Sequence, residues 1–322
     1  MTFYLCEDCA NFMYDPITVC PQCGAASVCV AEESDEVHAE RIRASKGDAK
    51  AQRSLGQRYY EGDGLPQNYE IAVFWYRKSA EQGNAGAQVL LGLCYKDGIG
   101  VPKNQAAAVQ LYQQAADQKH PLGQMLLGMC YMIGAGVPKN LSRGVELYQA
   151  AAERGEITAQ FSLGTCYEGG AGVERNWSMA AKWYHRAAEG GHAEAQYRFG
   201  WLLECGVGVE KDACSAAEWY RKSAAQGNAE AQYRLGLMLL HAVGTEENVM
   251  ESMRYCRMAA EQGYPEAKCM LGIYHFYGHG VERDFTESKR LLREAASAGS
   301  RSAKKFLRKW IFLYVKEQWR RS

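Results

Sequence analysis

The pattern of apolar and polar positions repeats along most of the chain. Sliding the sequence against itself by 36 positions aligns the stretch from Gly47 to Ala298 as seven units without an insertion. A Leu-Gly pair, replaced in the fifth unit by Phe199-Gly200, recurs at Leu55-Gly56, Leu91-Gly92, Leu127-Gly128, Leu163-Gly164, Leu235-Gly236 and Leu271-Gly272. A second glycine recurs at Gly64, Gly100, Gly136, Gly172, Gly208, Gly244 and Gly280. Fixed periods of this size are typical of stacked-repeat architectures.

Each unit predicts two helices. The first begins after a glycine and a polar cap, as in "GNAEAQ". Pro121 and Pro265 fall in its first turn, where a missing N–H does no harm. This helix ends at a Gly-x-Gly loop, whose glycines can take the positive φ angles of a tight exit. The second helix begins after a short polar residue that can cap its free N–H groups, at Asn68, Asn104, Asn140, Asn176, Asp212, Asn248 and Asp284.

Small and bulky positions in the second helix predict close packing between the two helices of a unit. Small residues recur at Ala72, Ala108, Gly144, Ala180, Ala216, Ser252 and Ser288. Bulky residues recur at Tyr76, Tyr112, Tyr148, Tyr184 and Tyr220. One such hairpin cannot bury its apolar face alone, but a row of hairpins forms a continuous core. The repetition is therefore structural.

The repeated pattern A-x-A-Q-x-x-L-G-x-x-Y-x-x-G-x-G-V-x-x-N/D resembles the Sel1-like repeat, a longer relative of the tetratricopeptide repeat, over about four fifths of the chain. The resemblance implies an all-α fold, an α/α superhelical solenoid that serves as an adaptor or scaffold for other proteins. Later units depart from the pattern. Leu203, Leu239 and His275 replace a tyrosine, and the sixth unit carries "HAVGTEEN" where a Gly-x-Gly loop is expected. These departures question the local geometry and not the fold.

One face of the first helices points away from the core leucine when residues are placed at about 100° each. This face is apolar where a surface helix would be polar, and by resemblance to tetratricopeptide arrays it lines a concave groove. The candidate partner-binding residues are Leu93, Met129, Phe161, Tyr197, Trp201, Tyr233, Leu237 and Ile273, with Glu194, Glu230 and Glu266 along one edge; Val89, Met125 and Phe276 share the face. Such a groove suits a peptide or helix with apolar anchors and basic residues. Alternatively, superhelical curvature buries part of this face.

Four cysteines before the repeats form the pattern C-x2-C-x10-C-x2-C, at Cys6, Cys9, Cys20 and Cys23. Two such knuckles can close four thiolates around a structural Zn²⁺, which stabilises a segment too short for a core of its own. The second knuckle, "CPQCG", resembles a zinc-ribbon turn. Disulfides or free thiols are the alternatives. The expected domains are a zinc-ribbon-like module at 1–29, an acidic linker or capping helix at 30–46, the repeats at 47–298 and a basic capping helix at 299–322.

The other cysteines predict no disulfide framework. Cys94, Cys130 and Cys166 share one position of their units, a full repeat apart, and we expect small buried apolar residues there. The remaining cysteines share no spacing. This absence of a recurring pair favours a reducing, cytoplasmic environment.

Composition adds an asymmetry between the chain's ends. The 322 residues have a formal net charge of zero, yet residues 1–46 carry eight acidic and three basic side chains, and residues 299–322 carry one and eight. The start "MTFYLCEDCANF" lacks the features of a signal peptide, and no apolar run reaches the ~18 residues of a membrane span.

Catalytic motifs are missing from the sequence. It contains no G-x-S-x-G, no H-E-x-x-H and no phosphate-binding loop. We therefore expect no enzyme activity and no catalytic residues, but a protein-protein interaction scaffold whose cofactor is structural Zn²⁺. The alternative is a nucleic-acid-associated protein that uses the zinc ribbon and the basic C-terminal helix with its "KKFLRKW" stretch. Salt dependence of binding would separate the two functions.

Overall fold

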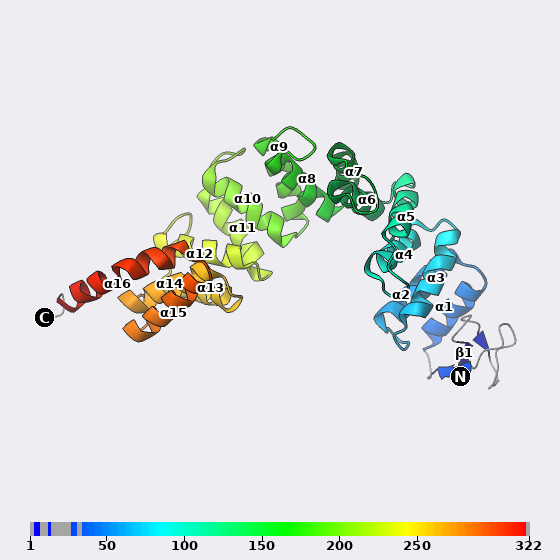
Figure 1. Cartoon of the computed structure of the whole chain (residues 1–322), viewed down its shortest axis with the longest axis horizontal. Coiled ribbons are helices and arrows are strands. Elements are labelled where there is room, and N and C mark those ends of the chain that lie inside the picture. The colour runs from blue at the N-terminus through cyan, green and yellow to red at the C-terminus, as the bar shows by residue number, and fades with distance from the viewer. Residues whose placement is uncertain (1–2, 7–11, 14–26, 31–33, 320–322) are drawn as a thin grey trace. The chain divides into compact units, whose positions relative to one another are not determined.

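The computed structural model describes residues 3–6, 12–13, 27–30 and 34–319. Within them the chain forms sixteen helices and three short strands (Figure 1). The strands are β1 (Phe3–Cys6), β2 (Phe12–Met13) and β3 (Ser27–Val30), which pair antiparallel in the order β2-β1-β3. The helices are α1 (Asp35–Ser45), α2 (Ala49–Glu61), α3 (Tyr69–Glu81), α4 (Ala85–Asp97), α5 (Gln105–Asp117), α6 (Pro121–Ile133), α7 (Leu141–Glu153), α8 (Ile157–Gly169), α9 (Trp177–Glu189), α10 (Ala193–Cys205), α11 (Ala213–Ala225), α12 (Ala229–His241), α13 (Val249–Glu261), α14 (Pro265–Tyr277), α15 (Phe285–Ser297) and α16 (Arg301–Trp319).

The chain divides into two compact units. Unit 1 comprises Met1–Ala159 and Ala171–Val173, and unit 2 comprises Gln160–Gly170 and Glu174–Ser322. Helix α8 crosses the boundary between them. In both, the prediction of two helices per repeat is confirmed: an A helix (even-numbered, α2 to α14) is followed by a B helix (odd-numbered, α3 to α15).

Within each hairpin a bulky B-helix side chain lies on an A-helix glycine. A Cβ atom added at Gly92 would lie 2.5 Å from Cε1 of Tyr112, and one added at Gly56 would lie 2.7 Å from Cδ1 of Tyr76. The later repeats use smaller side chains, with Cys256 on Gly236. The predicted small residues of the B helix are fully buried beside this contact. The recurring Leu-Gly pair thus sets the distance between the two helices of a hairpin.

The connection between the helices of a hairpin is held by main-chain atoms and one cap. The N-cap residue Asn68 accepts a hydrogen bond from the Ile71 N–H at 3.0 Å, and its own N–H donates to the Tyr59 carbonyl at 2.9 Å. The predicted N-caps are confirmed in every B helix. Where Leu203 replaces the tyrosine, its carbonyl still accepts from the Asp212 N–H at 3.0 Å. Because a carbonyl makes this bond, replacing the tyrosine leaves the loop unchanged.

Two positions in each A-to-B loop need a positive φ angle. The first ends the A helix, as Gly206 does at φ 71°, and in the sixth repeat Ala242 adopts φ 53° there. The second lies against the preceding B helix: a Cβ at Gly208 would be 2.4 Å from the carbonyl carbon of Trp177. The second glycine is therefore required by both its conformation and its neighbour, whereas the first is favoured mainly by its conformation and is replaced by Ala242 in the sixth repeat.

Glutamine side chains connect neighbouring hairpins. Gln196 Nε2 donates to the Ala188 carbonyl of the preceding B helix at 3.1 Å, and Gln196 Oε1 accepts from Gln226 Nε2 at 2.8 Å. Gln232 and Gln262 repeat this arrangement one hairpin later. Each buried amide thus satisfies a helix-end carbonyl and ties two hairpins together.

The first and last helices flank the repeats. On α1, Glu36 and Glu40 each accept a bond at 2.6 Å from the guanidinium of Arg58, which also pairs with Asp63. Helix α16 packs on α15 and α14 (Figure 1). None of the described helices is long and apolar enough to cross a membrane.

We predict that Ala242→Gly stabilises the protein. An alanine in the left-handed region carries a backbone strain that glycine does not, so the change is expected to add about 0.5–1 kcal/mol. The urea midpoint and the Tm of the purified chain measure this. Ala225→Gly, at the exposed last residue of α11, is the control and is expected to lower stability by up to about 1 kcal/mol. Equal losses for both variants would contradict the prediction.

We also predict a pH-dependent cap at the start of α10. Neutral His192 accepts a hydrogen bond from the Ala195 N–H at Nδ1 (3.2 Å), and burial lowers the pKa of His192 below its ordinary 6.5. The unfolded chain therefore binds more protons than the folded chain between those two pKa values, so stability falls as the pH drops through that window.

Asparagine is the test substitution for this cap, because Asn84 and Asn228 occupy the equivalent position in other repeats. Between about pH 7.5 and pH 5, the His192→Asn variant is expected to lose up to about 1 kcal/mol less stability than the wild type. Urea titrations of both proteins at the two pH values give the difference. Parallel pH profiles would contradict the role of His192.

Candidate partner-binding surface

The predicted partner-binding residues lie on one face of the A helices, called here the A-helix face. In unit 2 it carries two rows of side chains, one containing Phe161, Tyr197 and Tyr233 and the other Trp201, Leu237 and Ile273. All six are half-buried. Leu93 and Met129 hold the second-row position in unit 1 and are also half-buried.

Part of the expected face is buried. Val89 is 1% exposed and Met125 9% exposed, although both hold the first-row position in unit 1. Phe276 is also buried, because Phe285, Phe306 and Trp310 surround its ring. Including these three residues in an open groove was therefore wrong.

The aromatic rings of the A-helix face are held by contacts beneath them. Phe161 stacks on His192 with centroids 4.5 Å apart, and Tyr197 lies 5.9 Å from the ring of Tyr220. Trp201 lies 6.3 Å from Trp177 in a tilted arrangement. These half-buried rings each rest against another ring, which suits an anchor for a partner.

Charged residues that the sequence analysis did not single out also lie on α8, α10 and α12. Arg198 pairs with Glu194 at 3.0 Å and with Glu168 at 3.4 Å. Arg234 lies 3.6 Å from Glu204. The first-helix pattern contained a signal for them, because arginine occupies in α10 and α12 the position that leucine holds in α4 and α6. The sequence prediction used only the apolar positions and one acidic edge, so it did not include these arginines.

Two of these carboxylates also bind buried tyrosines. Tyr220 donates to Glu204 at 2.6 Å, and Tyr184 donates to Glu168. Burial and then the adjacent carboxylate raise the pKa of Tyr220 above its ordinary value. Both phenols therefore stay protonated and act as fixed donors, which positions Glu204 and Glu168 on the face.

The three glutamates of the predicted edge differ in their partners. Glu194 accepts from Arg198 and from Asn228 (3.0 Å), and Glu266 accepts from Ser300 at 2.6 Å. Glu230 makes no hydrogen bond or ion pair within the described part of the chain. It lies close enough to Tyr197 and Tyr264 to raise their pKa, after the larger effect of burial. Glu230 is therefore the edge carboxylate most available to a basic group.

In unit 1 the face contains a small cavity between α2 and α4. Its volume is about 140 Å³, and it is lined by Tyr60, Leu90 and Leu93 together with Gln57, Glu61, Tyr76, Cys94 and Asp97. A cavity of this size accommodates one apolar side chain and not a drug-sized ligand.

The seven cysteines whose side chains are described are free, and the prediction that Cys94, Cys130 and Cys166 are buried is confirmed. Burial raises the pKa of Cys94 and of Cys166 to about 11, so these thiols stay protonated. Of the predicted zinc ligands, Cys9, Cys20 and Cys23 lie outside the described residues, and Cys6 is described only as part of the β1 backbone. Among the described side chains, no group of three or more His, Cys, Asp or Glu could hold a metal ion.

Comparison with protein families finds seven matches to the Sel1 repeat, at residues 49–84, 85–120, 121–156, 157–192, 193–228, 229–264 and 265–300. These ranges begin at the A helices and end just after the B helices. No curated protein sequence matches the chain.

The solved structures that match this chain include two with more than 30% sequence identity. A protective antigen of uropathogenic Escherichia coli strains, which displays an SLR fold, is 34% identical with a TM-score of 0.78. That match covers 84% of this chain and 58% of the antigen, so the present chain spans little more than half of that protein. A Sel1 repeat protein from Oxalobacter formigenes is 31% identical with a TM-score of 0.65, over 76% of this chain and 96% of that one.

Proposed function

Because the chain belongs to the Sel1 repeat family, we propose that it is a non-enzymatic scaffold that binds another protein. The partner presents a peptide or a helix to the A-helix face of unit 2. The observation that carries this proposal is the pair of half-buried aromatic and aliphatic rows in α8, α10, α12 and α14. Large apolar side chains with one exposed side are the usual centres of protein interfaces.

The charges on the face indicate the chemistry of the partner. Carboxylates outnumber guanidinium groups there, since Arg198 and Arg234 face Glu168, Glu194, Glu204, Glu230 and Glu266. A partner with apolar anchors flanked by lysine or arginine would be complementary to both features. Arg198 and Arg234 would in turn favour an acidic residue at two fixed places. The face is therefore suited to a segment of mixed charge.

We predict that Trp201→Glu with Leu237→Glu abolishes partner capture. Both side chains are half-buried in the second row, and a carboxylate there places an unpaired charge at the centre of the interface. Loss of binding by at least about tenfold is expected, which corresponds to ~1.4 kcal/mol. Crosslinking and affinity capture from native extract, followed by direct titration of the captured protein, provide the measurement.

Met258→Glu is the matched control, because Met258 is an exposed apolar residue of α13 in the same unit and lies off the A-helix face. Circular dichroism and Tm of all variants check that the fold is kept. Partners that bind the double variant and wild type equally would rule out the A-helix face as the docking site.

The alternative function is association with nucleic acid through the N-terminal segment and the basic α16. Phosphate contacts would make such binding fall steeply with salt and leave it unaffected by the Trp201 and Leu237 substitutions. The titrations above, repeated at two salt concentrations, separate it from protein binding.

We further propose that Cys6, Cys9, Cys20 and Cys23 hold a structural Zn²⁺. The register of the N-terminal sheet supports this. Cys6 at the end of β1 pairs with Ser27 at the start of β3, and the neighbouring pair joins Leu5 with Phe12. The end of β1, the start of β2 and the start of β3 therefore meet at one end of the sheet. In sequence, Cys9 lies three positions before β2 and Cys23 lies four positions before β3.

The zinc proposal predicts one Zn²⁺ per chain after purification without added metal, measured by mass spectrometry. Cys20→Ser with Cys23→Ser is expected to lose the metal, and Cys205→Ser with Cys214→Ser, which changes two exposed cysteines of unit 2, is expected to retain it. A metal-free wild-type chain with four reactive N-terminal thiols would exclude the site.

A further inference from the structure

Helix α16 occupies the place of an A helix, and no B helix follows it within the described residues. Ser300 caps it by accepting from the Ala303 N–H at 3.0 Å, as Asn84 caps α4 by accepting from Ala87. Ala303 is fully buried, like Ala267 at the same position of α14. In the seven repeats the opposite side of the A helix is covered by the following B helix. No such helix covers α16 within the described residues.

The residue at the glycine position of α16 prevents a B helix from packing there in the usual way. Arg308 stands 36 positions after Gly272 and so holds the equivalent position in α16. A Cβ atom added at Gly272 would lie 2.8 Å from Leu292 Cγ of the following B helix. An arginine at this point keeps a second helix at a distance. The uncovered side of α16 is therefore unsuited to another hairpin of the same kind, including one from a second copy of the chain.

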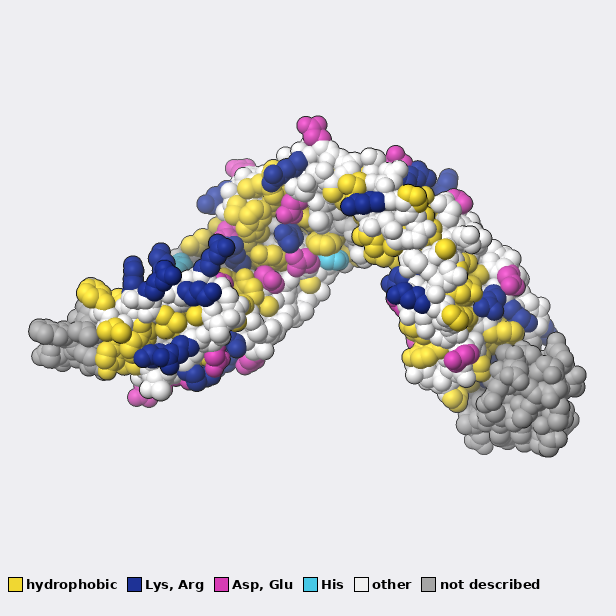
Figure 2. Space-filling model, in the orientation of Figure 1, with side chains coloured by type: hydrophobic (Ala, Val, Ile, Leu, Met, Phe, Trp, Pro, Cys, Tyr) yellow, Lys and Arg dark blue, Asp and Glu magenta, His cyan; other side chains and the backbone are white. Residues whose placement is uncertain are grey.

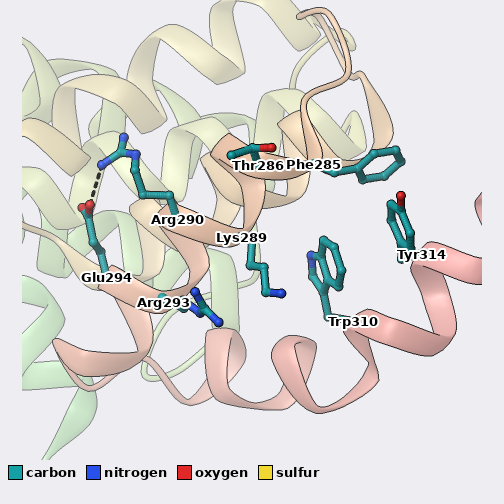
Figure 3. A pocket seen from close by; sticks show the side chains of 8 residues that line it. All are labelled: Phe285, Thr286, Lys289, Arg290, Arg293, Glu294, Trp310 and Tyr314. Carbon is teal, nitrogen blue, oxygen red and sulfur yellow. Dashed lines mark hydrogen bonds and ion pairs between the residues drawn. The ribbon is translucent and has the colours of Figure 1, made fainter.

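The packed side of α16 is fixed by aromatic contacts with α15. Trp310 stacks on Tyr314 with centroids 5.0 Å apart, and Tyr314 meets Phe285 edge-on at 4.9 Å. Figure 3 shows Trp310 and Tyr314 projecting toward α15, with Lys289 pointing toward Trp310. The Lys289 Nζ atom lies 4.8 Å from the centre of the Trp310 ring. These contacts determine which residues of α16 face outward.

The outward side of α16 combines positive charge with two apolar side chains. Ile311 is 74% exposed and Phe312 73% exposed, the two highest exposures among the large apolar residues of the described chain. Figure 2 shows lysine and arginine side chains gathered beside hydrophobic ones at this end of unit 2. Among the described side chains of the helix, the exposed basic residues are Arg301, Lys304, Lys305, Arg308 and Lys309. No acidic residue occurs between Arg301 and Tyr314.

We propose that α16 lies on the surface of a bilayer that contains anionic lipid. At 100° per residue the five cations spread over the outward side, with Phe312 among them and Ile311 at its border. A headgroup layer offers anions to the cations and an apolar interior to these two side chains at a single boundary, which is how basic amphipathic helices bind membranes. The helix binds parallel to the surface, and the repeats stay in water.

Two other partners, nucleic acid and a helix of another protein, fit the outward side of α16 less completely than a bilayer does. Nucleic acid would pair its phosphates with the cations and could stack a base on Phe312, but it would leave the aliphatic Ile311 in water. A helix of another protein would bury both apolar residues, but Arg308 keeps it from close packing. Only the bilayer uses the charges and both apolar residues together.

The test is flotation of the full chain with vesicles of phosphatidylcholine alone or with about 30% phosphatidylglycerol. We expect binding to the anionic vesicles only. Ile311→Ser with Phe312→Ser is expected to weaken it about tenfold, and Arg308→Glu with Lys309→Glu by more than that. All four residues are exposed, so helicity and Tm should be unchanged.

Matched controls distinguish local from general effects. Met250→Ser with Met258→Ser removes two exposed apolar residues of α13, and Lys182→Glu with Arg221→Glu reverses two exposed charges of unit 2; both are expected to bind as wild type. The proposal is overturned if the full chain does not bind anionic vesicles at low salt. It is also overturned if the serine pair leaves binding unchanged, if single-stranded RNA binds more tightly under the same conditions, or if the serine pair instead disperses a dimer.

Discussion

The close approach of two helices at a glycine is the contact on which the rest of the structure depends. In each hairpin the A-helix backbone passes directly under a B-helix side chain, with no space for a Cβ at Gly56, Gly92 or Gly128. This brings the N-cap of the B helix within hydrogen-bond distance of the A-helix carbonyl at the loop. It also places the second loop glycine against the preceding B helix. The short distance between the two helices of a hairpin therefore also affects how one hairpin contacts the next.

Because main-chain atoms make most of these junctions, the side chains around them can vary. Leu203, Leu239 and His275 replace a tyrosine, yet their carbonyls accept the same bond at 2.9–3.0 Å. Ala242 adopts the left-handed conformation at the end of α12 because the loop around it is held at both ends. Positions with no room for a Cβ atom do not vary in this way, because no other residue can replace a glycine that lies against main-chain atoms.

The sequence predicted the fold for the same physical reason. A steric requirement that recurs every 36 residues leaves a glycine that can be found by inspection, and a helix cap leaves an asparagine or aspartate. The proposed binding face has no such requirement. Helical geometry places its candidate residues on one side of the A helix but does not determine their burial: Val89 and Met125 are buried, whereas Tyr197 and Tyr233 are half-buried. The Arg198 and Arg234 pairs depend on contacts across neighbouring A helices, which periodicity alone does not provide.

The A helix therefore has two sides under different constraints. The side toward its own B helix is constrained by the glycine contact and barely changes between repeats. The other side bears no part of that contact, and the chain uses it differently in its two units, with leucines in α4 and α6 and arginines in α10 and α12. Helix α16 reverses this division. With Arg308 at the glycine position and no B helix covering it among the described residues, the side that is structural elsewhere becomes a surface. A repeat can thus offer a surface for binding in two ways, by varying the free side of an A helix or by leaving the packing side uncovered.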